Sequence, residues 1–193
     1  MSHTGDICDP AFIKSLIGPE TCLVYHLAAI VSGQAEADFD LGMRVNFDAT
    51  RALLEACRQQ AQAPRFVFAS SLAVFGGPMP EQVPEELAPL PQSSYGAQKA
   101  MAELLINDYS RKGFIDGRVC RLPTISVRPG KPNAAASSFA SGILREPLAG
   151  EASNCPVPLD TRMWLSSPQT VVDNLVHASR LDAYALDLRR TLN

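Results

Sequence analysis

The sequence has little that would mark a protein that binds nucleic acid, binds metal or spans a membrane. Its 17 Lys and Arg residues are outnumbered by 20 Asp and Glu residues, so the net charge of −3 leaves no basic surplus to neutralise phosphates. The five cysteines form no CxxC pair, and no group of His, Cys, Asp and Glu has the spacing of metal ligands. The longest apolar stretch, at residues 22–31, is too short to span a bilayer. We therefore expect no nucleic acid, metal or membrane among the partners.

Glycine-rich loops and a targeting segment are also missing. No GxGxxG or GxxGxxG motif, the sequence that places a pyrophosphate at a helix N-terminus, occurs in the 193 residues. The first residues have neither the basic start nor the apolar run of a signal peptide. The odd number of cysteines, mostly among apolar neighbours, predicts buried free thiols in a reducing compartment. The expected location is the cytoplasm.

What is present is an alternation of segments that predicts strands and helices in turn. A continuous apolar run, which is typical of a strand covered on both faces of a parallel sheet, occurs at residues 22–29. A second buried strand is predicted at 64–69 and a third strand at 117–122. Helical spacing or capping signals predict helices that begin at Asp9-Pro10 or cover residues 39–60, 95–112, 139–145 and 168–181. Together these patterns predict an α/β fold with a parallel sheet and flanking helices.

The most informative residues are Ser71, Tyr95 and Lys99. A Tyr and a Lys four positions apart on one helix, here with Ser94 as the expected cap, lie on the same face, one turn apart. An ammonium beside a phenol favours the ionised phenol and so makes it a usable acid or base. Ser71 ends the strand before this helix, where a hydroxyl can hold an oxygen that is being oxidised or reduced. We therefore predict that these three residues are catalytic.

The segments SSLAVFG at 70–76 and YGAQK at 95–99 resemble those of the extended short-chain dehydrogenase/reductase family, which includes nucleotide-sugar epimerases and dehydratases. The resemblance covers nearly the whole chain. It implies a Rossmann-type sheet, NAD as cofactor and a homodimer formed through helices 43–60 and 95–112. The residues that it implies for cofactor binding are Asp6, Ile7, Leu27, Ala28, Ala29, Asn46, Tyr95, Lys99 and Pro123.

Residues 31–40, 121–133 and 137–150 resemble more closely a subgroup of this family that oxidises small sugar acids similar to D-erythronate. An acid substrate requires a cation, and an Arg fork suits a carboxylate. The resemblance places the substrate near Ser71, Arg128, Asn133 and Arg145. A nucleotide-sugar epimerase or dehydratase remains an alternative within the same family.

The family's first strand, glycine-rich turn and second-strand acidic residue are not found before Gly5. We therefore expect a chain truncated at both ends: a partial, NAD(P)-binding Rossmann-type domain with the catalytic residues at 1–149, and part of a substrate-binding region at 150–193. The choice between NAD and NADP stays open at the missing second-strand position. A non-catalytic remnant that acts as an interaction module is the alternative to an enzyme.

Overall fold

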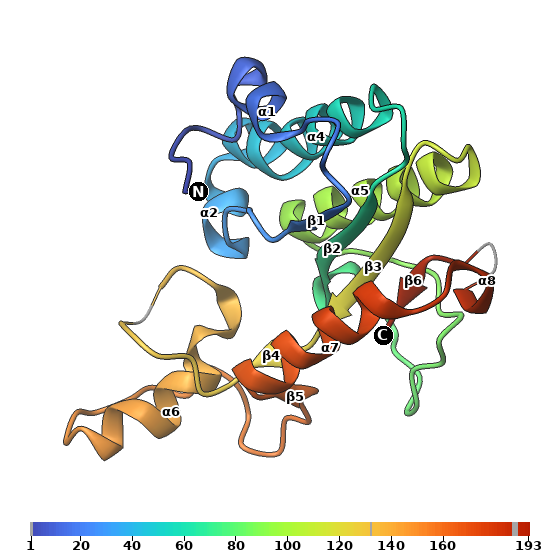
Figure 1. Cartoon of the computed structure of the whole chain (residues 1–193). Helices are drawn as coiled ribbons and strands as arrows, with labels where there is room; N and C mark the ends of the chain where they lie inside the picture. Colours follow the sequence, from blue (N-terminus) through green and yellow to red (C-terminus); the bar gives the residue numbers. More distant parts are fainter. Residues whose placement is uncertain (1, 132, 187–188) are drawn as a thin grey trace.

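The computed structural model describes residues 2–131, 133–186 and 189–193. At its centre is a parallel sheet with the strand order β1-β2-β3-β6 (Figure 1). The strands are β1 (Leu23–His26), β2 (Arg65–Ser71), β3 (Asp116–Leu122) and β6 (Thr191–Leu192). The predicted α/β fold with a parallel sheet is confirmed.

Helices cover both faces of this sheet because side chains alternate along β2. Phe66 and Phe68 face one core, which they share with α1 (Pro10–Leu16), α4 (Ala49–Arg58) and α5 (Ser94–Arg111). Val67 faces the opposite core, against α7 (Pro168–Arg180). Strict alternation of this kind follows from the two-residue period of a strand, and it explains why the apolar run of β2 is continuous.

The predicted helix over residues 39–60 is interrupted by a turn of π-helix. It divides into α3 (Phe39–Gly42), the π-helical segment η1 (Met43–Asp48) and α4. Single π-helical turns inside helices often mark functional positions, and this one contains Asn46. The cap of α5 also differs from the prediction: Ser93, not Ser94, accepts the hydrogen bond from the Gly96 amide.

The prediction of a strand covered on both faces is wrong for β1. The strand is shorter than residues 22–29, and Leu23 and Tyr25 are 38% and 39% exposed. The physical reason is its place in the sheet: β1 is an edge strand, hydrogen-bonded to β2 alone among the described strands. An apolar run indicates that a strand favours burial, but the elements that pack beside the strand determine how much of it is covered.

The prediction that the cysteines are buried is correct for two of them. Cys57 and Cys120 lie in the two cores, and all five thiols are free. Cys22 is exposed because it comes just before the edge strand β1, and Cys8 and Cys155 are half-buried. Burial raises the pKa of Cys57 to about 12 and that of Cys120 to about 11, so both thiols stay protonated at neutral pH.

Beyond β3 the chain leaves the main sheet and later returns to it. It forms the two-stranded sheet of β4 (Thr124–Ile125) and β5 (Leu165–Ser166), with α6 (Phe139–Leu148) between them in sequence (Figure 1). The remaining elements are short: α2 (Ser32–Ala37), η2 (Leu72–Val74), η3 (Ala136–Ser138) and α8 (Ala183–Leu186). No helix in the described residues is long and apolar enough to cross a membrane.

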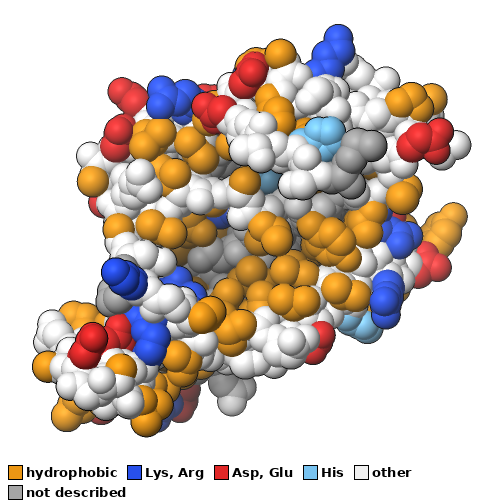
Figure 2. Space-filling view, turned by 60° about the vertical axis from the view of Figure 1, so that its left-hand side comes forward, with side chains coloured by type: hydrophobic (Ala, Val, Ile, Leu, Met, Phe, Trp, Pro, Cys, Tyr) orange, Lys and Arg blue, Asp and Glu red, His pale blue; other side chains and the backbone are white. Residues whose placement is uncertain are grey.

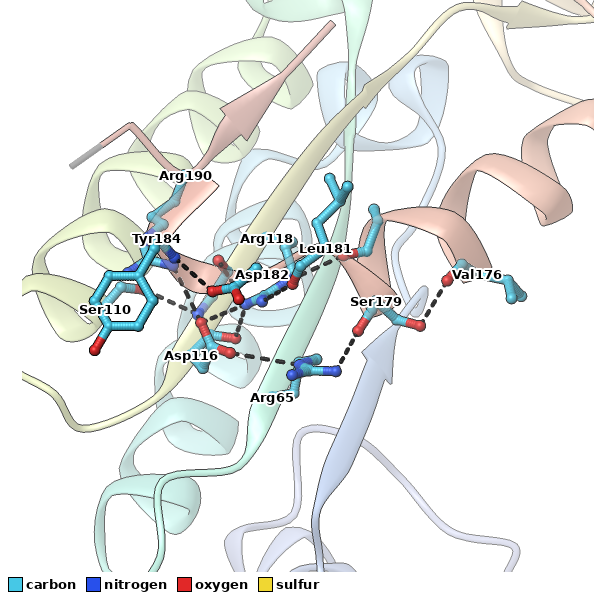
Figure 3. A network of polar contacts seen from close by, with 12 residues as sticks. Arg65, Ser110, Asp116, Arg118, Val176, Ser179, Leu181, Asp182, Tyr184 and Arg190 are labelled. Carbon is cyan, nitrogen blue, oxygen red and sulfur yellow. Dashed lines mark hydrogen bonds and ion pairs between the residues drawn. The ribbon is translucent and has the colours of Figure 1, made fainter. Parts of the chain in front are cut away.

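Arginine side chains fasten the end of α7 to the main sheet (Figure 3). The guanidinium of Arg118 on β3 is fully buried, donates to the carbonyls of Ala178 and Leu181 at 3.0 and 2.7 Å, and pairs with Asp116. Arg65 on β2 donates to the carbonyl of Ser179 at 2.6 Å. These donors satisfy carbonyls that the last turn of a helix leaves without intrahelical partners.

Candidate active site

The first turns of α5 bring Tyr95 and Lys99 to the carboxyl end of β2. Lys99 is buried, and its Nζ donates to the carbonyl of Ala69 at 2.8 Å. The same Nζ lies 4.5 Å from the ring centre of Phe68 and 5.7 Å from that of Tyr95. The predicted juxtaposition of ammonium and phenol on one helix face is therefore present.

Ser71 is the last residue of β2, and its hydroxyl accepts a hydrogen bond from the Ala73 amide at 3.1 Å. This bond caps the 3-10 turn η2, which carries the chain away from the sheet. The Ser71 hydroxyl lies near the phenol of Tyr95, whose pKa it lowers. The strand end and the helix start thus place a hydroxyl and a phenol together.

Burial dominates the electrostatics of both titratable groups. It raises the pKa of Tyr95, and the Ser71 hydroxyl opposes this by a smaller amount. Burial also lowers the pKa of Lys99 to about 8, with the carboxylate of Glu103 acting in the opposite direction. The net pKa of Tyr95 is thus raised rather than lowered in this structure, and activation of the phenol by Lys99 stays a prediction.

Tyr95 and Lys99 line a cavity of about 720 Å³, which we call the Tyr95 cavity. Its wall also contains Ser70 and Leu72, the neighbours of Ser71 in sequence. Of the residues predicted to bind cofactor or substrate, those in the wall are Leu27, Ala29, Tyr95, Lys99, Pro123 and Arg128. In the space-filling view the molecule is hollowed on this side, and hydrophobic side chains gather along the rim (Figure 2).

Asn46 holds one wall of the cavity in place without lining it. Its Oδ1 accepts from the amide of Ile30 at 2.9 Å, and its Nδ2 donates to Oε1 of Gln98 at 2.8 Å. The loop that follows β1 is thereby tied to α5. Asn46 thus acts on the predicted cofactor residues Leu27 and Ala29 through the backbone of their loop.

Other predicted cofactor residues lie beside the Tyr95 cavity. Ile7, Leu27 and Ala28 line a neighbouring cavity of about 380 Å³ along β1. Asp6 is exposed, and its carboxylate accepts from the amide of Cys8 at 2.8 Å. Leu27 belongs to both cavities, whereas Asp6 and Asn46 line neither of them.

The predicted substrate residues divide into two groups. Arg128 reaches the Tyr95 cavity, whereas Asn133 and Arg145 are outside its described wall. Asn133 stabilises an exposed turn, with its Oδ1 accepting from the Ala135 amide at 3.0 Å. Arg145 pairs with Glu146 and donates to the carbonyl of Arg128 at 2.7 Å. Arg145 therefore supports the backbone of Arg128.

Comparison with known proteins gives a family match over most of the chain. The family model described as NAD dependent epimerase/dehydratase family matches residues 2–165. The chain belongs to this family. NAD is therefore the cofactor of the family to which the chain belongs.

Three relatives illustrate how similar the chain is to other members of the family. It is 62% identical over 190 residues to D-erythronate dehydrogenase of Cupriavidus necator, covering 98% of this chain and 59% of that protein. It is 58% identical over 184 residues to D-erythronate dehydrogenase of Haemophilus influenzae, covering 95% and 58%. A crystal structure named as a nucleoside-diphosphate-sugar epimerase from Agrobacterium tumefaciens superposes with a TM-score of 0.91 at 49% identity, covering 97% and 56%. The chain thus spans less than two thirds of each relative.

The residues around the Tyr95 cavity fit the nicotinamide end of NAD. The Lys99 ammonium has three N–H donors, and the Ala69 carbonyl accepts one of them in the described contacts, so donors remain for ribose hydroxyls. Ala29 and Ala69 present little bulk to a ring lying against the wall. Pro123 lies in the same wall. In this family member, these are the residues that would hold the cofactor.

Three polar residues of the site were not found from the sequence. Glu36 lines the Tyr95 cavity, and its carboxylate accepts from the Ser94 amide at 2.8 Å. Glu103, one helical turn beyond Lys99, forms a buried ion pair with Arg121 of β3. For Glu103, the four-residue spacing from Lys99 is the sequence feature that indicates a shared helix face. For Arg121, it is the presence of an arginine within the predicted strand at 117–122.

Proposed function

We propose that this chain belongs to an NAD-dependent dehydrogenase that oxidises a hydroxyl of a small sugar acid similar to D-erythronate. The observation that carries the proposal is the set Ser71, Tyr95 and Lys99 beside one cavity, with Arg128 in its wall. The identity of 62% and 58% to two D-erythronate dehydrogenases supports this substrate class. The activity is proposed for the protein of which these residues form a part.

In the proposed mechanism Tyr95 is the base. Its phenolate accepts the proton of the substrate hydroxyl, while Ser71 donates a hydrogen bond to the same oxygen. The Lys99 ammonium stabilises the phenolate and donates to ribose hydroxyls of the cofactor. NAD, when bound, supplies the acceptor for the hydride.

Arg128 is the proposed partner of the substrate carboxylate. A guanidinium presents two parallel donors to a carboxylate and so fixes its orientation as well as its charge. The backbone carbonyl of Arg128 is held by Arg145 and its amide by the Ser141 hydroxyl at 3.0 Å. Arg145 therefore contributes to substrate binding by positioning Arg128, and Asn133 by shaping the loop that follows.

Three further points are proposed with the function. The protein works in the cytoplasm, which the free buried thiols of Cys57 and Cys120 support. It forms a homodimer through η1, α4 and α5, which the exposed Leu104 on α5 supports. Residues 1–149 form the cofactor-binding part and 150–193 contribute to the substrate side, although α7 and β6 of the latter range pack against the main sheet.

Titration of the chain with NAD, followed by turnover of D-erythronate, tests the proposal. We expect saturable NAD binding. In Tyr95→Phe, turnover should fall by about a thousandfold or more because the proton acceptor is lost, while the Kd for NAD stays within about threefold. Leu165→Ala, on β5 outside the described wall of the cavity, is the control: a protein variant prepared in the same way should keep its turnover.

The outcomes separate the possible functions. Retained turnover in Tyr95→Phe would refute the assigned base. Turnover of a nucleotide sugar with none of D-erythronate would favour the epimerase or dehydratase alternative. If the chain does not bind NAD at any concentration, a non-catalytic interaction module would be the remaining candidate function of the chain as it stands.

A further inference from the structure

A buried ion pair lies directly behind Lys99. Glu103 follows Lys99 by one helical turn on α5, and its carboxylate accepts from Nη2 of Arg121 at 2.7 Å and from Nε at 3.1 Å. The two residues are only 2% and 7% exposed. Charges are expensive to bury, and a buried ion pair adds little net stability compared with apolar residues of the same size. Such a pair next to a titratable site therefore needs another explanation.

The same carboxylate joins the three elements that build the site. Oε1 of Glu103 also accepts from the Ser70 hydroxyl at 2.5 Å. Ser70 directly precedes Ser71, and the carbonyl of Ala69, one position earlier, holds Lys99. Glu103 thus connects the end of β2, the Lys99 turn of α5 and, through Arg121, strand β3.

Glu103 is also the acidic group that acts on Lys99. The Lys99 ammonium meets the Ala69 carbonyl and the Phe68 ring from β2, and Tyr95 from α5. From β1 it faces His26, whose pKa is lowered to about 3 by burial and by Lys99 itself, so this imidazole is neutral. Arg121, the nearby cation of β3, is bound to Glu103.

We propose that Glu103 is a positioning residue for the proposed dehydrogenase: its carboxylate keeps Lys99 in the charged form and locks the Ser70-Ser71 strand end to the Lys99 turn. This inference rests on the proposed function only for its effect on turnover. The effect of Glu103 on Lys99 itself is a property of the free protein. Arg121 serves by holding the carboxylate in place, and its guanidinium lies 4.8 Å from the ring centre of Phe75.

The test is an NMR titration of the lysine side chains in the full chain without ligand. The protein is labelled with 13Cε-lysine, and its four lysines, Lys14, Lys99, Lys112 and Lys131, give four signals. The variant is Glu103→Gln, whose amide oxygen can still accept from Ser70 and Arg121 while the negative charge is gone. We expect the Lys99 midpoint to move down by about one pH unit or more, with the other three lysines unchanged.

Ser70→Ala is the matched control because it breaks a contact of Glu103 but leaves the carboxylate charged. It should leave the Lys99 midpoint within about 0.3 pH units, so that a change in Glu103→Gln alone reports the charge. Where turnover is measurable, the basic limb of the kcat/KM profile in Glu103→Gln should move to lower pH by the same amount, which a loss of folded protein would not cause.

Glu103→Gln leaves Arg121 without a counter-charge, so the double variant Glu103→Gln/Arg121→Met provides a second route if the single variant does not fold. Lys99 should again titrate below the wild-type midpoint, since of the two paired charges Glu103 is the one that acts on the pKa of Lys99. An unchanged Lys99 midpoint in a folded variant overturns the inference. A shifted midpoint together with no NAD binding would sustain the inference and show that the chain as it stands does not perform the proposed function.

Discussion

Lys99 illustrates how the burial of a charged side chain works against the stability of the fold. The residue is 2% exposed, and burial lowers its pKa from 10.5 to about 8. The unfolded chain therefore holds the proton more tightly than the folded protein, which at neutral pH costs about 3 kcal/mol at 1.36 kcal/mol per pKa unit. Since the folded pKa is the lower one, this cost is present in full below about pH 8 and is relieved as the pH rises from 8 toward 10.5.

Replacement of Lys99 by Met should therefore stabilise the protein at pH 7 while removing the ammonium from the site. The substitution removes the cost of about 3 kcal/mol, but the Ala69 carbonyl loses a donor worth about 1 kcal/mol. We therefore expect a net gain of about 2 kcal/mol in the free energy of unfolding. Urea unfolding at pH 7 and pH 9.5 measures the gain, which should shrink at the higher pH. Lys14→Met, at an exposed position of α1, should change stability by less than about 0.5 kcal/mol. A Lys99→Met protein less stable than wild type at pH 7 would contradict the argument.

At the scale of elements, local sequence signals predicted where helices and strands form but not how they are joined. Asp9 caps α1 and Ser167 caps α7 through side-chain bonds that the sequence makes recognisable. The π-helical turn at Met43–Asp48 has no such signal, and its Asn46 contacts Ile30 and Gln98, which belong to other segments. The docking of α7 likewise depends on arginines from other elements.

Arg118 is the element-scale test. Arg118→Met should lower the free energy of unfolding by about 3 kcal/mol, because the carbonyls of Ala178 and Leu181 lose their donor inside the protein. Urea unfolding, followed by the helical signal in circular dichroism, measures the loss. Arg111→Met is the control: Arg111 pairs with Asp108 on the surface and is 57% exposed, so its loss should cost less than about 0.5 kcal/mol. Equal losses in both variants would show that the Figure 3 network contributes no more than a surface pair.

At the scale of the whole molecule, the outer face of α5 carries an apolar residue that the monomer does not bury. Leu104 is 69% exposed, whereas the buried face of this helix contains Ala102 and Ile106. A helix period predicts a stripe only approximately, so polar residues such as Glu103 can occupy the inner face. Exposure of Leu104 on the helix pair of the proposed dimer makes it the residue to change.

Leu104→Glu should turn the proposed homodimer into a monomer, since a carboxylate would lose its hydration in the interface. Light scattering coupled to gel filtration measures the mass, and circular dichroism should remain unchanged. Leu159→Glu, in a turn where the leucine is 96% exposed, should leave the dimer intact. A monomeric wild-type protein, or a dimer that survives Leu104→Glu, would refute the proposed interface.

The sequence by itself determined the alternation of strands and helices, the parallel sheet and the pairing of Tyr95 with Lys99. These depend on periodicity and spacing within one segment, which local geometry translates directly into structure. Only the tertiary structure decided that Arg128 reaches the Tyr95 cavity while Arg145 supports it, and that Glu103 meets Arg121 and Ser70. These contacts join segments that are far apart in the chain. The packing of the folded protein, rather than the neighbouring residues in sequence, therefore determines the partner of a buried charge.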